Sequence, residues 1–495
     1  MVGNVLHRKL ARDLRGGWGQ FTAAAAVVLW ATVLFVSFQV TYRSLLHSRD
    51  SYYRRCNFAD FFVDLENAPS SALSAAQSIK GVWRVRGRIV KEVSLEMEGE
   101  EGAAVGRIIS MPRRRDDLIN DIYMVSGSYF PGAASEEVII NQRFAEANGL
   151  AVGDSLRATI NERKEDLRIV GTAYSPEYVY PLRDARQFAP DDKGFAIIFA
   201  RRGFVEDAFD MTNDFNNLVG VLRPGADVEA VLDRAKERFS RYGVYARYGR
   251  ARQLSHNYLE QELQGVKVSA RIVPAIFLTV AAVVIHIIMR RMVQMQRTQI
   301  GLLRALGYGR LRIALHYISY ALVVGVAAAA LGVVGGLYLA RGILAMYHPF
   351  FRFPSLRVQS APSALLLAFG LSCGMCVLGA LRSAWKAMRL DPAVALRPRA
   401  PRLERIVHRD ALAPLWEKVP LTWRMNARNA LRNKTRAAFT VFGVAISMMM
   451  LVVGRNNMNL FNWIVKHQYE DVELADFRVD FADQRPTHSI LDVEA

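Results

Sequence analysis

The sequence predicts a polytopic α-helical membrane protein with a large α/β extracytoplasmic domain, built as a four-span unit followed by the first span of a second repeat. Three observations support this fold class. Five stretches of 18 to 27 residues contain no Asp, Glu, Lys or Arg, the basic excess is confined to a few segments, and the end of the chain repeats the pattern of its beginning.

Each of the five stretches is long enough to cross a bilayer as a helix. A hydrocarbon core about 30 Å thick needs about 20 apolar helical residues, because each residue adds about 1.5 Å of rise. The first stretch is too long for a signal peptide, and no small-residue cleavage site follows it. The predicted spans are residues 21–40, 272–289, 314–340, 361–381 and 437–454.

The positions of the basic residues predict how the spans are oriented. Residues 1–20 carry four Lys or Arg against one acid, residues 290–312 six against none, and residues 382–436 fourteen against four. These segments account for the whole net charge of +18. Basic loops stay on the cytoplasmic side of a membrane, so the excess indicates topology and not a nucleic-acid partner. We therefore expect a cytoplasmic N-terminus and an extracytoplasmic C-terminus in a lipid bilayer.

The segments between the spans follow from this orientation. We expect a cytoplasmic amphipathic leader at 1–20, an extracytoplasmic α/β domain at 41–271, a cytoplasmic loop at 290–313, an external loop at 341–360, a basic cytoplasmic linker at 382–436, and an incomplete second extracytoplasmic domain at 455–495.

Residues 41–271 are enough for one or two domains. Glu137–Asn141 predicts a short strand, and Gln142–Asn148 predicts a helix. From Asp227 the apolar residues follow helical spacing to about Gly243. The alternation of strands and helices predicts a mixed α/β module.

The end of the chain repeats its beginning at a spacing of 416 residues. Arg12 precedes the first span and Ala59–Asp64, just as Arg428 precedes the fifth span and the similar Ala475–Asp480. Internal repeats that contain membrane spans are typical of transporters. The second copy stops after its opening strand, so we expect a truncated or split form of a longer protein, or a subunit that a partner completes.

No motif for catalysis or metal binding occurs in the sequence. It contains no G-x-x-x-x-G-K-[ST] phosphate loop, no G-x-S-x-G, no H-E-x-x-H and no pair of Cys-x-x-Cys zinc ligands. Cys373 and Cys376 lie within a span, where packing is favoured over redox chemistry. His286 and His316 lie near the cytoplasmic ends of their spans, where a structural role is favoured over a proton relay. We predict no catalytic residue, no metal and no cofactor in this chain.

The most specific local sequence is the loop RMVQMQRTQIGLLRALGYGRLRI, Arg291–Ile313. It predicts a short amphipathic helix that a glycine pair ends. One side of the helical wheel holds Arg297, Gly301, Arg304 and Tyr308, and the other holds Leu302, Leu303 and Leu306. Two interpretations remain open: the helix lies on the membrane surface with its arginines on lipid phosphates, or it docks into a groove of a cytoplasmic motor subunit.

Small residues recur at every fourth position of the third predicted span. They are Ala328, Gly332, Gly336 and Ala340. One face of this helix is therefore nearly flat, and another helix can approach it closely. We predict a helix-packing seam along this face.

Several motifs occur in an order that resembles a known family. The loop reads Arg297-x-x-Ile300-Gly301-x-Leu303-Arg304-Ala305-x-Gly307, and Asp391-Pro392-Ala393-x-Ala395-Leu396-Arg397 follows the fourth span. The segment 41–271 adds Tyr129-Phe130-Pro131, Gly153-Asp154 and Val170-Gly171. These motifs resemble the FtsX-like, MacB/LolC-related (type VII) ABC transporter permeases over residues 8–397 and again from 424. Many members have acidic residues where this chain has Gln296 and Gln299.

The resemblance implies a permease subunit of the bacterial cell (inner) membrane, driven by a separate cytoplasmic ABC ATPase dimer that binds the ATP. A second permease copy or the missing half, and an extracytoplasmic adaptor, are further expected partners. The expected function is export or extraction of lipid, lipoprotein, peptide or drug substrates through movement of the external domains. The alternatives are an ATPase-coupled regulator of a cell-wall hydrolase and, less favoured, a membrane receptor or adhesion module. The ATPase-coupling residues would be Arg297, Ile300, Gly301, Leu303, Arg304, Leu306 and Gly307.

Overall fold

A computed structural model describes residues 2–97, 104–132, 134–187, 189–359, 362–396, 420–423, 425 and 434–467. Within these residues the chain divides into two compact units. The helical unit holds residues 2–37, 270–338, 362–396 and 434–467, and the α/β unit holds residues 38–269 and 339–359. Most of the predicted linker at 382–436 lies outside the described residues, as do residues 468–495 with the predicted strand Ala475–Asp480.

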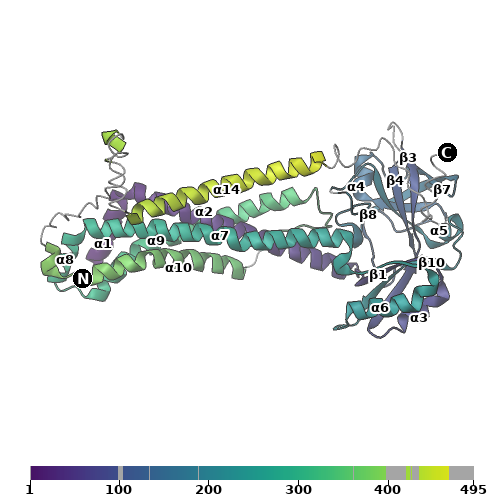
Figure 1. Ribbon diagram of the computed structural model, residues 1–495, viewed down its shortest axis with the longest axis horizontal. Helices are drawn as coiled ribbons and strands as arrows, with labels where there is room; N and C mark the ends of the chain where they lie inside the picture. Colours follow the sequence, from purple (N-terminus) through teal and green to yellow (C-terminus); the bar gives the residue numbers. More distant parts are fainter. Residues whose placement is uncertain are drawn as a thin grey trace, which may run out of the picture. The chain divides into compact units, whose positions relative to one another are not determined.

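Among the described residues, four helices are long and apolar enough to cross a membrane (Figure 1). They are α2 (Trp18–Arg55), α7 (Leu254–Met295), α9 (Arg310–Tyr347) and α10 (Pro362–Met388). Each contains one of the first four predicted spans, and α2 and α7 also occupy the two ends of the predicted segment 41–271. The structure also describes α1 (Val2–Gly16), α8 (Arg297–Ala305), α11 (Pro392–Leu396) and α14 (Lys434–His467) in this unit.

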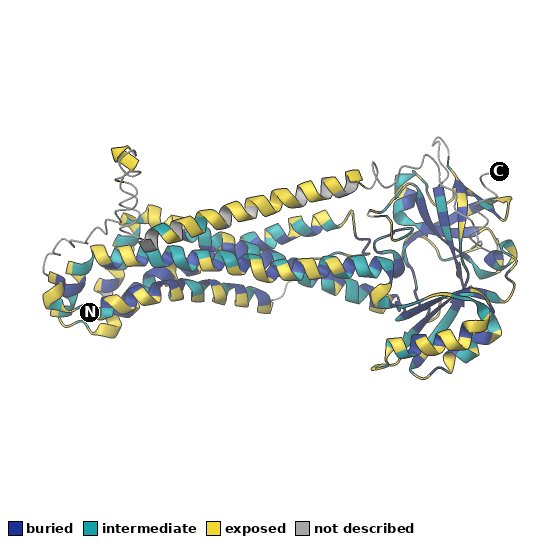
Figure 2. Cartoon of the chain, in the orientation of Figure 1, coloured by how far each residue is buried: buried dark blue, intermediate teal, exposed yellow. Residues whose placement is uncertain are grey.

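The fifth predicted span, residues 437–454, lies within α14. This helix is 34 residues long, and its described side chains are mostly exposed (Figure 2). Its passage through a membrane stays a prediction.

Small residues allow close helix contacts inside the helical unit. The four small residues predicted to form the seam on α9 are buried: Ala328, Gly332, Gly336 and Ala340. Gly332 and Gly336 contact α2. A Cβ atom placed on Gly332 would lie 2.6 Å from Thr32 Cβ, and one on Gly336 would lie 2.5 Å from Val36 Cβ. Real Cβ contacts are longer, so only glycine fits at these two crossings. The backbones of α2 and α9 therefore touch there.

The first of two sheets in the α/β unit has four antiparallel strands. Its order is β11 (Val244–Gly249), β1 (Phe61–Pro69), β10 (Asp214–Leu222) and β2 (Val82–Arg88). Helices α3 (Leu73–Gln77) and α6 (Val228–Phe239) pack on this sheet and share an apolar core with it. The predicted helix from Asp227 is α6, and the Asp227 carboxylate caps it by accepting from the Glu229 N–H at 3.0 Å.

The second sheet has seven strands and is mixed. Its order is β5 (Tyr123–Gly127), β8 (Arg163–Tyr174), β6 (Glu137–Asn141), β9 (Phe195–Arg201), β4 (Ala104–Met111), β3 (Val90–Glu96) and β7 (Ser155–Ile160). The pairs β6–β8 and β4–β9 are parallel, and β7 also pairs with β8, so the order closes into a ring. The predicted strand at 137–141 is β6, and the predicted helix after it is α4 (Gln142–Ala147). The other short helices are α5 (Arg202–Ala208), η1 (Ser70–Ala72), η2 (Pro176–Tyr178), η3 (Ser240–Tyr242) and η4 (Arg250–Arg252).

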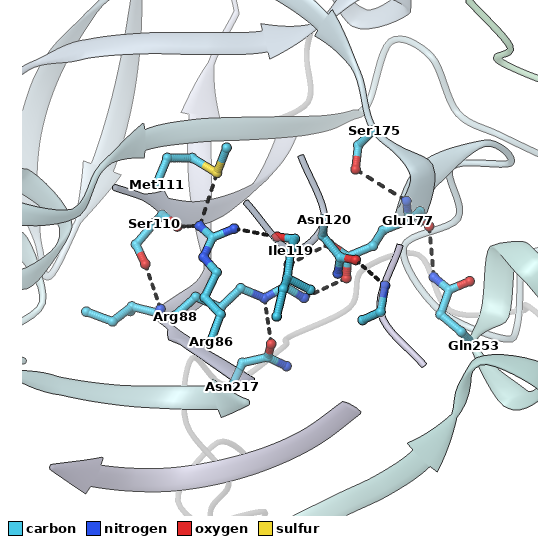
Figure 3. A network of polar contacts seen from close by, with 12 residues as sticks. Arg86, Arg88, Ser110, Met111, Ile119, Asn120, Ser175, Glu177, Asn217 and Gln253 are labelled. Carbon is cyan, nitrogen blue, oxygen red and sulfur yellow. Dashed lines mark hydrogen bonds and ion pairs between the residues drawn. The ribbon is translucent and has the colours of Figure 1, made fainter. Parts of the chain in front are cut away.

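A buried polar network joins the two sheets (Figure 3). Arg88, at the end of β2, donates to both carboxylate oxygens of Glu177 at 2.5 and 2.6 Å, and to Asn217 Oδ1 at 2.6 Å. Arg86, two residues earlier, donates to the Ile119 and Ser110 carbonyls at 2.9 and 2.7 Å, and Ser110 belongs to β4 of the second sheet. The side chains of Arg88 and Glu177 are only 4% and 6% exposed.

Burial and neighbouring charges shift the pKa values of Arg88 and Arg86 in opposite directions. Burial alone would lower the pKa of Arg88, but the Glu177 carboxylate outweighs it and holds the pKa above its usual value. Burial, and then the charge of Arg88, lower the pKa of Arg86 to about 9. Glu177 supplies the carboxylate that pairs directly with the buried Arg88, so we expect the network to depend on this residue.

Candidate functional site

Helix α8 lies between two of the candidate spans and is separated from α7 by a break at Gln296. Gln296 is the N-cap residue of α8, with φ −92° and ψ 16°. The helix ends at Leu306, and Gly307 follows with φ +90°, a left-handed conformation that glycine adopts without strain. The predicted end of the helix at the glycine pair is therefore observed.

The inner face of α8 packs on α11 and on the end of α10. Arg297 Nη2 donates to the Val394 carbonyl at 2.5 Å, and Arg304 Nη1 donates to the Met388 carbonyl at 2.9 Å. Between them, a Cβ atom on Gly301 would lie 2.7 Å from Ala395 Cβ. The two arginines satisfy carbonyl groups at helix ends, where a positive charge is favourable. These two hydrogen bonds hold α8 against α11 and the end of α10.

The outer face of α8 is exposed and partly apolar. Leu302 is 54% exposed and Leu306 is 68% exposed, whereas Leu303 packs against the helical core. In α11, Val394 and Leu396 are about half exposed as well. The outer face consists of Thr298, Gln299, Leu302, Ala305 and Leu306, which follow helical spacing. This is the surface of α8 that a partner or a lipid head group could reach.

The structure divides the seven predicted coupling residues between the two faces. Ile300 and Gly301 are buried, Arg297, Leu303 and Arg304 are half-buried, and Leu306 and Gly307 are exposed. Leu302 is exposed, although the motif match gave it no role. A helical wheel separates two sides of a helix but does not tell which side meets the rest of the chain, so the sequence could not select Leu302.

A polar cluster from α1 fixes the break between α7 and α8. The Asp13 carboxylate accepts hydrogen bonds from Lys9, from Gln296 Nε2 at 2.8 Å and from Tyr320 Oη at 2.8 Å. Gln296 Oε1 in turn accepts from Lys9 Nζ at 2.9 Å and from Tyr317 Oη at 2.8 Å. The cluster joins α1, the N-cap of α8 and α9. Its one signal in the sequence is that Asp13 is the only acid among residues 1–20.

We expect Asp13→Asn to loosen α1 from this cluster. Burial alone would raise the pKa of Asp13, but hydrogen bonds from Lys9, Tyr320 and Gln296 outweigh it, so the pKa lies below its usual value. A carboxylate with a lowered pKa stabilises the folded state above its ordinary pKa, and this stabilisation is lost only as the pH falls through the lowered value. The protection of α1 amides against hydrogen exchange in the full chain should therefore stay the same from pH 8 to pH 5. At pH 7 the Asp13→Asn substitution should accelerate exchange in α1 by on the order of tenfold.

The matched control for this experiment is Arg15→Gln, since Arg15 is exposed on the same helix. Its exchange should stay near that of the unchanged chain. Equal exchange in Asp13→Asn and Arg15→Gln would show that the carboxylate does not hold α1.

The two histidines near the cytoplasmic ends of the predicted spans have structural contacts. His286 Nδ1 lies 3.1 Å from the Gly379 carbonyl. His316 Nε2 lies 3.3 Å from Tyr320 Oη, which itself donates to Asp13, so the acid nearest this histidine comes from α1 and not from a span. A search of the described residues finds no group of three or more His, Cys, Asp or Glu that could hold a metal ion.

The helical unit matches a known family. Residues 271–392 match the model for the FtsX-like permease C-terminal domain, and this range includes α8, α9 and α10. No curated protein matches the chain.

Solved structures with some similarity are two extracytoplasmic domains and one domain of a putative permease protein. The extracellular domain of the noncanonic ABC-type transporter YknZ from Gram-positive bacteria is 12% identical over 39% of this chain and 98% of its own, with a TM-score of 0.27. The periplasmic region of MacB from Actinobacillus actinomycetemcomitans is 8% identical over 43% and 95%, with a TM-score of 0.27. A domain of a putative permease protein from Porphyromonas gingivalis is 13% identical over 37% and 83%, with a TM-score of 0.24.

The matched range contains the break at Gln296, helix α8 and two complete candidate spans. Residues 271–392 of this chain match the FtsX-like permease C-terminal domain.

Proposed function

We propose that the protein is the permease subunit of an ABC transporter and that the outer face of α8 docks on a cytoplasmic ATPase. The match of residues 271–392 to FtsX-like permeases supports this assignment. The observation that carries it is the division of α8 into a clasped inner face and an exposed outer face with two leucines. An exposed apolar face on a short, firmly held helix suits a protein partner better than a solvent contact.

The contacts of α8 give the docked ATPase a path into the spans. A force on the outer face acts through Arg297 and Arg304 on α11 and α10, and through the Asp13 cluster on α1 and α9. Helices α2, α7 and α9 each contain residues of both units, so they connect this movement to the α/β unit. Under the proposed topology the α/β unit lies outside the bacterial inner membrane, with the N-terminus in the cytoplasm. ATP hydrolysis would then move this unit to extract or export lipid, lipoprotein, peptide or drug substrates.

Leu302→Asp and Leu306→Asp test the docking surface. Each places a charge on the outer face, and a charge that loses its water in an apolar interface weakens binding strongly. Full-length variants should be co-expressed with a candidate ATP-binding subunit from the neighbouring reading frames. We expect at least a tenfold loss of co-purification and of permease-dependent stimulation of ATP hydrolysis. Val152→Asp, at a 45% exposed position of the α/β unit, is the control and should keep both.

A second pair of variants tests the hydrogen bonds that Arg297 and Arg304 donate to α11 and α10. Arg297→Gln and Arg304→Gln leave the outer leucines in place but remove the contacts to the Val394 and Met388 carbonyls. We expect them to bind the ATPase and to lose stimulation. If the leucine variants bind and stimulate as the control does, the outer face of α8 is not the docking site.

A further inference from the structure

A small pocket, partly open to solvent, lies within the α/β unit. Ile197 and Phe199 of β9 line it beside Pro181. Its polar lining comes from four elements: Asn141 at the end of β6, Arg143 in α4, Tyr174 at the end of β8, and Arg352 in the segment after α9. An apolar wall with a few convergent polar groups is typical of a ligand site.

Arg352 is the most unusual of these residues. Its side chain is only 5% exposed. Nη2 donates to both Asp192 oxygens at 2.9 and 2.7 Å, and the backbone N–H donates to the Val179 carbonyl at 2.8 Å. Nε and Nη1 are buried and have no hydrogen-bond partner among the described residues. Buried guanidinium N–H groups are rarely left unpaired, because an unmet donor is destabilising.

Two acceptors of the pocket lining are already occupied. Asn141 Oδ1 accepts from the Ile197 N–H at 2.9 Å, and Gln142 Oε1 accepts from Thr172. Two donors of Arg352 have no partner among the described residues, so the missing partner is an acceptor.

We propose that this pocket binds an anionic oxygen group, a carboxylate or a phosphate, that carries a short apolar chain. Guanidinium groups favour such oxygens over neutral ones. Arg143 and Arg352 each already have an acidic partner, but Glu146 and Asp192 are 49% and 31% exposed, so water screens them from the pocket. Ile197, Phe199 and Pro181 form the surface for the apolar chain. The site lies in the α/β unit and does not depend on ATPase docking at α8.

Hydrogen exchange in the full chain, held in a neutral detergent, tests this assignment. The readouts are peptides that cover residues 139–145, 172–182 and 348–354. The additives are hexanoate, its neutral isostere hexanamide, inorganic phosphate and chloride at equal ionic strength. We expect hexanoate or phosphate to slow exchange in these peptides at least threefold relative to chloride, and hexanamide to leave it unchanged. Stronger protection by hexanoate identifies a carboxylate site, and stronger protection by phosphate identifies a phosphate site.

Two variants and a control connect the effect to the pocket. Arg352→Gln should abolish the protection, and exchange in β6 and β9 without additive shows whether this variant is folded. Arg143→Gln changes a side chain at the rim that is 26% exposed and should weaken the protection, so it tests the site even if Arg352→Gln does not fold. Arg163→Gln, at an exposed position of β8, should keep it. Equal protection by hexanamide, protection that survives in both pocket variants, or no protection by either anion would overturn the proposal.

Discussion

Glu177→Gln is expected to reduce the unfolding free energy of the α/β unit by about 3 to 5 kcal/mol, the usual effect of breaking a buried ion pair from one side. The amide cannot accept two charge-assisted hydrogen bonds from Arg88, which would remain buried beside the charge of Arg86. Urea unfolding of the full chain in detergent, followed by hydrogen exchange in β2, β4 and β10, measures this loss. Both sheets should be affected, because Arg86 joins β2 to β4 of the second sheet and Arg88 lies two residues away on β2.

Two further variants separate the buried pair from charge in general. Glu96→Gln removes an acid that pairs with Lys164 on the surface of the same unit, where both side chains are exposed, and should change the unfolding free energy by less than about 1 kcal/mol. Arg88→Met combined with Glu177→Met removes both charges and should recover part of the loss. A loss below about 1 kcal/mol for Glu177→Gln would show that the network does not hold the sheets together.

Gly336→Val is expected to separate α2 from α9 and to destabilise the helical unit by about 1 to 3 kcal/mol or more. The new Cβ would lie 2.5 Å from Val36 Cβ and 2.9 Å from the Val33 carbonyl oxygen, so the helices have to move. Small residues give close contacts between helices in membranes, where apolar burial alone does not favour association. The midpoint of thermal unfolding in detergent should fall, and hydrogen exchange in α2 near Val36 should accelerate.

Gly342→Val is the matched control for this substitution. It lies in the same helix, is exposed, and has no atom within 4 Å of an added Cβ. The same residue change should therefore leave the unfolding midpoint nearly unchanged. Similar midpoints for the two variants would mean that the glycine crossing is not what holds α2 against α9.

Local patterns in the sequence predict those features whose residues lie close together in the chain. Apolar length predicts four helices long enough to cross a membrane, and the described residues contain them as α2, α7, α9 and α10. The short strand pattern at residues 137–141 predicts β6, and the helical spacing of apolar residues from Asp227 predicts α6, since each depends on residues close in the chain. The loop motif predicts α8, its end at Gly307 and the family of residues 271–392.

Features made by distant residues are not encoded in this way. The Asp13 cluster brings together α1, the start of α8 and α9, and the Arg88 network joins η2 to strands of two sheets. The pocket beside Arg352 likewise needs β6, β8, β9 and the segment after α9. No periodicity or short motif connects such positions, because their contacts follow from the order of strands and the packing of helices.

By itself, the sequence determined which stretches are apolar enough to span a membrane, where the basic residues lie and which short motif joins the second span to the third. Only the tertiary structure decided which side of α8 is free. The arginine side is clasped to α10 and α11, and Leu302 and Leu306 are left outside. The physical reason is that amphipathicity depends on neighbours within one helix, whereas the partner of each face is a carbonyl or side chain supplied by a distant part of the chain.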